Sequence, residues 1–161
     1  MFEQSRPPDP GRQDIWDQQD MVAADARLLA PRLLVIDDDN LHRMIICRAA
    51  AKAGYLPAGA ATYDEAAKLA QETVFDCITL DLSLGAHAGS EMLHHLSELG
   101  CTAPIVVVSG CDHATCKEAV KLAGRLNLDV WECIPKPVDL VMLRHFLERL
   151  KAARAPAAIA A

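Results

Sequence analysis

The sequence lacks the long hydrophobic runs and the basic, apolar leader that would mark a membrane-spanning or exported protein. No apolar run approaches the ~20 residues that a membrane-spanning helix needs, because charged residues interrupt every hydrophobic stretch. The first residues, MFEQSRPPDPGRQD, are acidic and rich in proline, which is the opposite of a secretory signal peptide. These two absences predict a cytoplasmic protein with no membrane partner.

Clustered basic residues and paired cysteine motifs are also missing. The chain has 16 basic and 22 acidic side chains, and the basic ones form no stripe, which argues against nucleic acid as a partner. No CxxC motif occurs, so we expect reduced and mostly buried thiols. A zinc site on Cys111, His113 and Cys116 would lack a convincing fourth ligand. The six cysteines are Cys47, Cys77, Cys101, Cys111, Cys116 and Cys133.

The length of 161 residues and the hydrophobic fraction of 52% predict one compact domain with tails. We expect an N-terminal extension over residues 1–30, the domain over residues 31–151 and a disordered Ala/Pro tail over residues 152–161. Within the extension, residues 1–13 should be a mobile tail. The apolar spacing in residues 14–30 fits either an amphipathic helix, which could mediate a homodimer, or a fraying extension.

Short apolar runs alternate with longer amphipathic stretches throughout the domain. This alternation predicts a doubly wound α/β fold, with a parallel sheet covered by helices on both faces. The predicted strands are 32–37, 55–61, 75–81, 104–110 and 129–134. The predicted helices are 40–53, 63–73, 88–99, 113–126 and 138–151.

Polar residues follow four of these strands, at the sheet edge where such folds bind their ligands. The first strand ends in Asp37, which Asp38 and Asp39 follow, the third ends in Asp81, the fourth ends at Ser109, and Lys136 comes after the fifth. Converging carboxylates repel one another, and Mg²⁺ would relieve that repulsion. Each residue taken alone has an ordinary explanation, such as Asp39 capping a helix. Together they predict a magnesium-dependent phosphoryl-transfer site.

Four segments resemble the receiver domain of two-component response regulators: LLVIDDDNLHRMI, FDCITLDLSLGAHAGSEML, APIVVVSG and IPKPVD. The resemblance covers about residues 32–150 and implies a flavodoxin-like (βα)5 sandwich with strand order 2-1-3-4-5. It implies that Asp81 accepts a phosphoryl group from a sensor histidine kinase or a histidine phosphotransfer protein. Ser109 would be the switch hydroxyl and Lys136 the ion pair of the phosphate. The Mg²⁺ ligands would be Asp37, Asp38, Asp81 and the backbone carbonyl of Ser83.

The resemblance also implies a cis Lys136–Pro137 bond and a partner-facing role for Arg43. The chain departs from the family pattern at three places. Gly85 stands where a proline is usual, which predicts a floppier loop. Cys133 replaces the usual aromatic switch residue, and Trp131, expected on the same strand face, is the candidate to serve instead. The stretch from Ser109 to Lys136 is several residues longer than in most receivers, and this fourth-helix region resembles receivers related to cyclic-di-GMP phosphodiesterases. The resemblance further implies that Ser83 and Cys111 occupy positions that tune how long the phosphate lasts.

The leading hypothesis is a stand-alone response regulator that signals through phosphorylation-dependent contacts with an unknown protein target. On this hypothesis it is not an enzyme beyond its own phosphorylation and dephosphorylation, because few residues follow Leu150. One alternative is a haloacid-dehalogenase-like phosphatase, with Asp37 as nucleophile and Asp39 as general acid. Another is a pseudo-receiver scaffold that is never phosphorylated.

Overall fold

The computed structural model describes residues 29–154, and the division between compact units falls between residues 30 and 31. The expected tail at residues 1–13 and almost all of the possible helix at 14–30 lie outside the described residues, as does most of the expected C-terminal tail. Within the described part, no helix is both long and apolar enough to cross a membrane.

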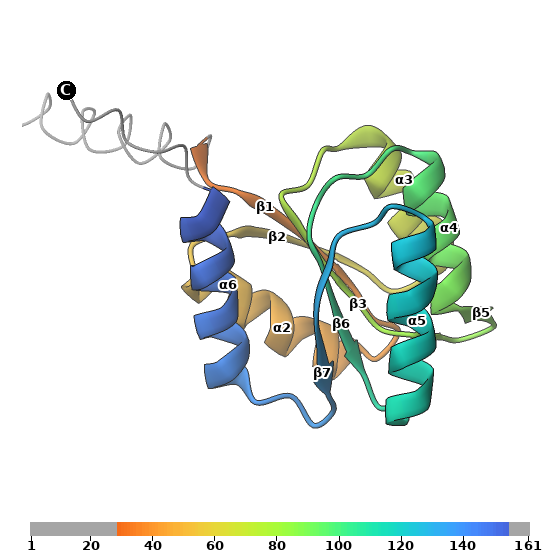
Figure 1. The fold of residues 1–161 in the computed structure, drawn as a ribbon. Coiled ribbons are helices and arrows are strands. Elements are labelled where there is room, and N and C mark those ends of the chain that lie inside the picture. Colours follow the sequence, from red (N-terminus) through yellow and green to blue (C-terminus); the bar gives the residue numbers. More distant parts are fainter. Residues whose placement is uncertain (1–28, 155–161) are drawn as a thin grey trace, which may run out of the picture. The chain divides into compact units, whose positions relative to one another are not determined.

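A five-stranded parallel sheet forms the centre of the domain (Figure 1). Its strands are β1 (Arg32–Ile36), β2 (Leu56–Ala60), β3 (Cys77–Leu80), β6 (Ile105–Ser109) and β7 (Val130–Pro135). They lie side by side in the order β2-β1-β3-β6-β7, and every neighbouring pair is parallel. Counted along the chain within this sheet, the order is 2-1-3-4-5, as expected.

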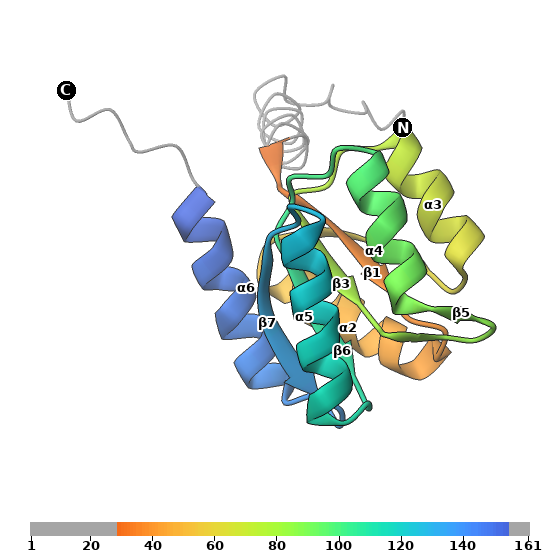
Figure 2. The same ribbon diagram turned by 45° about the vertical axis from the view of Figure 1, so that its right-hand side comes forward.

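Helices cover both faces of the sheet (Figure 2). One face carries α2 (Asn40–Lys52) and α6 (Leu140–Arg154), while the other carries α3 (Tyr63–Glu72), α4 (Gly89–Glu98) and α5 (His113–Arg125). Strand residues alternate between two hydrophobic cores, so that Leu34 packs on the side of α3, α4 and α5, and Leu33 on the side of α2 and α6. Both leucines are fully buried, which explains why the strands read as unbroken apolar runs.

Side-chain caps start three of the helices close to their predicted positions. Asp39 accepts a hydrogen bond from the backbone N–H of His42 at 2.8 Å, and Asp112 accepts one from Thr115 at 2.8 Å. Thr62 caps α3 in the same way. Each cap satisfies a backbone donor that the first turn of a helix leaves without a partner. The interpretation of Asp39 as a helix cap is therefore confirmed.

A small antiparallel hairpin between β3 and α4 was not predicted. Its strands, β4 (Ser83–Leu84) and β5 (His87–Ala88), are joined by a two-residue turn. Gly85 stands first in that turn with φ of 58°, a conformation that glycine adopts without strain and that tight hairpin turns favour. The segment after β3 therefore has regular structure, and the glycine that replaces the expected proline makes its turn.

Helix α6 runs three residues beyond the predicted end at residue 151, into the stretch expected to be a tail. The guanidinium group of Arg154 donates to the carbonyls of Asp76 at 3.0 Å and Thr102 at 3.1 Å. These bonds tie the last turn of α6 to the segments that enter β3 and β6. The extra turn therefore depends on contacts with residues far away in the sequence.

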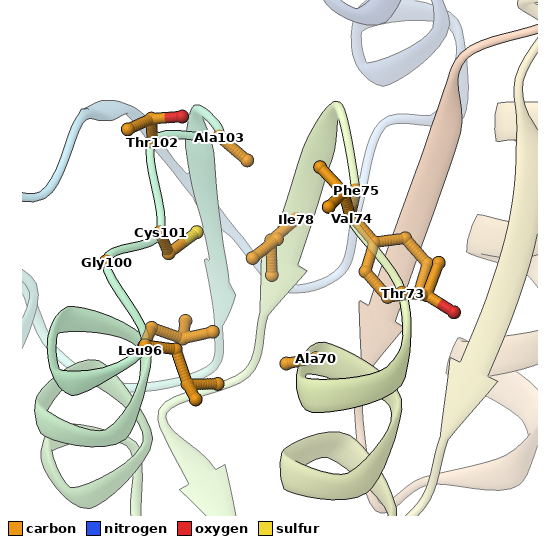
Figure 3. A pocket seen from close by; sticks show the side chains of 11 residues that line it. Ala70, Thr73, Val74, Phe75, Ile78, Leu96, Gly100, Cys101, Thr102 and Ala103 are labelled. Atoms are coloured by element: carbon orange, nitrogen blue, oxygen red, sulfur yellow. The ribbon is translucent and has the colours of Figure 1, made fainter.

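A small cavity of about 130 Å³ lies at the edge of the sheet where β3 and β6 begin, between the C-terminal ends of α3 and α4. Figure 3 shows Ile78 from β3 and Leu96 from α4 beside Cys101 at this cavity. The residues described in the next subsection lie at the opposite edge of the sheet, where the strands end. The cavity is therefore separate from the candidate site.

Candidate functional site

Four strand ends bring the predicted polar residues together at the carboxyl edge of the sheet. The backbone N–H of Asp37 donates to Ala60 at 3.1 Å, and that of Asp81 donates to Ile36 at 2.9 Å. The backbone N–H of Lys136 likewise donates to Ser109 at 3.0 Å. These bonds continue the parallel pairing one residue past each strand. Sheet register therefore sets the positions of the site residues, although they are far apart in the sequence.

Lys136 forms two ion pairs that link the acidic strand ends. Its ammonium nitrogen lies 2.9 Å from Oδ2 of Asp37 and 2.8 Å from Oδ2 of Asp81. The side chains of the two aspartates are 1% and 5% exposed, so the pairs are largely shielded from water. Burial lowers the pKa of Lys136, but hydrogen bonds and charges from Asp81 and Asp37 raise it more, and the net shift is upward. The lysine is therefore held in its charged form.

The remaining oxygen of each buried aspartate is bound to backbone. Oδ1 of Asp37 accepts from the N–H of Asp39 at 2.9 Å, and Oδ1 of Asp81 accepts from the N–H of Ser83 at 3.0 Å. Each carboxylate is thus held by one backbone donor and one charged donor. This arrangement fixes both side chains in orientation, and the backbone donor at Ser83 comes from the hairpin that the sequence did not reveal.

The carboxylates of Asp37, Asp38 and Asp81 form a cluster suited to a divalent cation. One oxygen from each lies within 4.8 Å of the others, and Asp38 is exposed whereas the other two are buried. Three carboxylates are the donor set that hard cations such as Mg²⁺ prefer. Among the described residues this is the only such group, so Cys111, His113 and Cys116 do not form a second candidate metal site.

Ser109 lies at the end of β6 and is fully buried. Its hydroxyl oxygen accepts a hydrogen bond from the backbone N–H of Cys111 at 3.2 Å. The Cys111 thiol in turn lies 3.5 Å from the hydroxyl of Ser83. The loops after β3 and β6 therefore touch each other beside Asp81, through the two positions that we expected to influence phosphate lifetime.

Arg43, on α2, hydrogen-bonds to the backbone of the site residue Asp37. Its guanidinium group donates to the backbone carbonyl of Asp37 and to the side chain of Asn40, both at 2.8 Å. Its aliphatic stem lies against Gly59, where even a methyl group would come within 3.2–3.3 Å of it. Arg43 thus connects α2, the end of β1 and β2, a contact that the sequence did not indicate. The partner-facing role expected for Arg43 stays a prediction.

Trp131 and Cys133 do not follow the strict strand alternation that we expected. Ile105 pairs with Val130 and Val106 with Glu132, so an irregularity leaves Trp131 without a register partner in β6. Val130 and Cys133 both pack against the core beneath α5, whereas Trp131 is 46% exposed and donates to Asp129 at 2.7 Å. The bulge breaks the two-residue period on which the expectation that Trp131 shares the face of Cys133 was based, and a switch role for either residue stays a prediction.

Comparison with known proteins supplies an independent view of the chain. A family model described as the response regulator receiver domain matches residues 33–148. A protein-glutamate methylesterase/protein-glutamine glutaminase 2 of Koribacter versatilis is 32% identical over 110 residues. That alignment covers 67% of this chain and 29% of the relative, so the chain spans less than a third of that protein.

Solved structures share the fold. A response regulator from Colwellia psychrerythraea superposes with a TM-score of 0.67 at 23% identity, covering 78% of this chain and 99% of that one. A response regulator protein from Burkholderia pseudomallei, solved with a phosphorylated aspartic acid, a calcium ion and citrate, gives a TM-score of 0.60 at 26% identity. That match covers 78% of this chain and 75% of the other.

Proposed function

The chain belongs to the receiver-domain family of response regulators, and from this premise we propose that Asp81 accepts a phosphoryl group and that its phosphorylation controls binding to a protein target. The donor is a phosphohistidine of a sensor kinase or of a phosphotransfer protein, in keeping with the family. The main support for the proposal is that Asp81 lies together with Asp37, Asp38 and Lys136 at one edge of the sheet.

Asp81 is the acidic residue best suited to act as the nucleophile. Its carboxylate is oriented by the N–H of Ser83 and by Lys136, and it follows the central strand β3. In the reaction one carboxylate oxygen forms a bond to phosphorus while the bond from phosphorus to the donor nitrogen breaks. Asp37 is held in the same way, by the N–H of Asp39 and by Lys136, so it is the family resemblance, and not the hydrogen bonding, that favours Asp81 over Asp37.

The site residues fit Mg²⁺. Asp37, Asp38 and Asp81 would hold the ion through carboxylate oxygens, and the backbone carbonyl of Ser83 is the further ligand that we propose. When bound, the ion supplies positive charge that offsets the carboxylates and the oxygens of an incoming phosphoryl group. The similar protein from Burkholderia pseudomallei was solved with both a calcium ion and a phosphorylated aspartic acid, which supports this proposal.

Lys136 and Ser109 are the groups placed to respond to the new phosphate. Lys136 already contacts Asp81, so its ammonium group can pair with a phosphoryl oxygen after small movement. Ser109 is bound within its own loop by Cys111, and turning its hydroxyl toward Asp81 would release that N–H. Such a turn would move the connection into α5 and so change the surface beside it. Ser109 is accordingly the switch hydroxyl of the proposal.

The phosphodonor is proposed to dock where α2 and α6 begin. Both helices start next to the carboxyl edge of the sheet, α2 just after Asp38 and α6 shortly after Lys136. Large apolar side chains are exposed there, which is the surface that a helical partner would bury. They are Leu41 at 62%, Met44 at 41%, Leu140 at 38%, Val141 at 62% and Met142 at 65% exposed.

Phosphorylation with acetyl phosphate and Mg²⁺ tests the proposal directly. The product is resolved on a phosphate-affinity gel, and the wild-type chain should shift while Asp81→Asn should not. Asp112→Asn is the matched control, since it removes an acidic charge at a helix cap outside the site and keeps a capping side chain. Equal labelling of wild type and Asp81→Asn would overturn the assignment.

A second experiment separates docking of the phosphodonor protein from the phosphorylation step itself. Val141→Asp should slow phosphoryl transfer from a purified phosphohistidine protein but leave labelling by acetyl phosphate unchanged. Val74→Asp is the control, because Val74 is 89% exposed and lies just before β3, away from the site. Binding partners captured only in the presence of beryllofluoride would then identify the target. A phosphatase activity that survives Asp81→Ala but not Asp37→Ala would instead support the haloacid-dehalogenase hypothesis.

A further inference from the structure

Arg43 holds the peptide group that joins two of the clustered carboxylates. Its Nη1 atom donates to the backbone carbonyl of Asp37 at 2.8 Å, and this carbonyl belongs to the peptide bond between Asp37 and Asp38. Its Nη2 atom donates to Oδ1 of Asn40, also at 2.8 Å. The guanidinium group therefore connects the end of β1 to the start of α2, and its planar fork of donors suits this double contact.

Gly59 leaves the space that the stem of Arg43 needs. It pairs with Val35 on the edge strand β2, and a methyl group at this position would lie 3.2 Å from Cδ and 3.3 Å from Cγ of Arg43. The φ angle of Gly59 lies outside the left-handed region, so its backbone conformation does not require glycine. The close passage of the Arg43 stem therefore gives the reason for a glycine inside this strand.

Asp38 is the member of the acidic cluster whose position depends most on its own backbone. Asp37 and Asp81 are buried, and backbone and charged donors hold their carboxylates, whereas Asp38 is exposed. Arg43 holds the peptide group before Asp38, and on the other side the N–H of Asp39 donates to Oδ1 of Asp37 at 2.9 Å. A cation must order this surface carboxylate when it binds, which costs less free energy if the backbone is already fixed.

We propose that Arg43 is a positioning residue for Mg²⁺, which fixes the backbone of Asp38 and so keeps its carboxylate in the acidic cluster. This rests on the proposed function, because it requires the three carboxylates to bind Mg²⁺. Arg43 has two opposing effects on that binding. Its positive charge repels the cation, whereas its hydrogen bonds preorganise a ligand, and residues that hold metal ligands in place are typically worth roughly 10- to 100-fold in affinity. Substitutions that keep the charge separate the two effects.

Calorimetric titration of the full chain with magnesium chloride at neutral pH tests the proposal. Arg43→Lys keeps the charge but loses the fork of donors, while Gly59→Val keeps Arg43 and fills the space of its stem. Both variants should bind Mg²⁺ roughly tenfold more weakly than the wild type. The matched controls should bind it as the wild type does: Arg48→Lys, at an exposed position further along α2, and Gly124→Ala, where a methyl group meets nothing within 4 Å.

Two further readouts distinguish positioning from a general loss of structure. In labelling by acetyl phosphate, the Mg²⁺ concentration that gives half the maximal rate should rise by the same factor, while the rate at saturating Mg²⁺ stays at the wild-type value. In EDTA, a peptide spanning residues 37–42 should exchange its amide hydrogens several-fold faster in both variants, because the turn from β1 into α2 is no longer held. This last measurement needs neither metal nor phosphate.

Wild-type Mg²⁺ affinity in both Arg43→Lys and Gly59→Val would overturn the positioning role and leave the proposed function intact. Weaker binding with unchanged amide exchange in EDTA would overturn it as well, because the backbone would then not depend on Arg43. Failure of the proposed function looks different: the wild-type chain then takes no label on Asp81, while the magnesium titrations still report on Arg43. If the wild-type chain binds no Mg²⁺, both proposals fail.

Discussion

Replacing Lys136 by methionine tests how strongly the two buried aspartates depend on its charge. Methionine keeps the length and much of the volume of the side chain but removes the ammonium group that contacts Asp37 at 2.9 Å and Asp81 at 2.8 Å. Each contact corresponds to about 6 kcal/mol of Coulomb attraction at an effective dielectric constant of 20. The cost of removing the 13% exposed lysine side chain from water offsets much of that sum.

The net expectation is a loss of roughly 3–5 kcal/mol in the free energy of unfolding, because the substitution leaves two carboxylates buried together without a cation. Urea unfolding in EDTA at pH 7 measures it, and the midpoint should fall by roughly 1.5–2.5 M for an m-value near 2 kcal/mol per M. Added Mg²⁺ should recover part of the loss, since a second cation then binds the native state alone.

Lys121→Met is the matched control for this experiment. Lys121 pairs with Glu118 at 3.0 Å, but the two side chains are 67% and 69% exposed. Water screens such a pair, so the substitution should cost less than about 1 kcal/mol. If the two variants lose the same stability, or if Lys136→Met unfolds at the wild-type midpoint in EDTA, the reasoning about the buried pairs is refuted.

The pH dependence of the Lys136→Met effect follows from the pKa of the lysine. Its folded pKa lies above the ordinary value of 10.5, although burial alone would lower it, because Asp81 and Asp37 stabilise the charged form. A raised folded pKa gives stability that is fully present below the unfolded pKa and disappears as pH rises through the folded pKa. The stability difference between wild type and variant should therefore stay constant from pH 7 to 9 and narrow only above pH 10.5.

Further predictions concern residues around the site. Gly89→Ala should lower the free energy of unfolding by roughly 1–3 kcal/mol, because the new methyl group would lie 2.7 Å from the backbone of Leu82. Gly124→Ala has nothing within 4 Å of the new methyl group and should raise the free energy of unfolding by about 0.5–1 kcal/mol. Urea unfolding measures both changes. Thr79→Val should raise the free energy of unfolding by about 1 kcal/mol, because the Thr79 hydroxyl is buried with no hydrogen-bond partner among the described residues; an unchanged or lower value would contradict this. Asp38→Asn should weaken Mg²⁺ binding at least tenfold by calorimetry, since it removes one of three clustered carboxylates, and affinity equal to wild type would remove Asp38 from the ligand set.

The local pattern of the chain was sufficient to predict the main sheet and its helices. Buried parallel strands must be apolar on both faces, and their crossovers need about a dozen residues, so the alternation of apolar runs such as Leu33–Ile36 with amphipathic stretches leaves few other folds. The same pattern placed Asp37, Asp81, Ser109 and Lys136 at strand ends, which is why the site could be proposed from the sequence. The cis bond before Pro137 was also expected and is confirmed.

Other features depend on contacts between segments that are distant in the sequence. The bulge at Trp131 arises from its pairing with β6, and no local spacing reveals that one residue of β7 lacks a partner. The hairpin at Gly85 is too short for a periodic signal, yet it supplies the N–H that orients Asp81. The last turn of α6 likewise depends on carbonyls that Arg154 reaches across the fold.

Sequence alone placed the end of each strand to within one residue, because hydrophobic periodicity is a property of neighbouring residues along one chain segment. Tertiary structure alone decided that Lys136 bridges two aspartates and that Arg154 reaches the segments before β3 and β6. The physical reason is that the partner of a charged side chain depends on sheet register and helix packing, which bring together atoms that no local pattern relates.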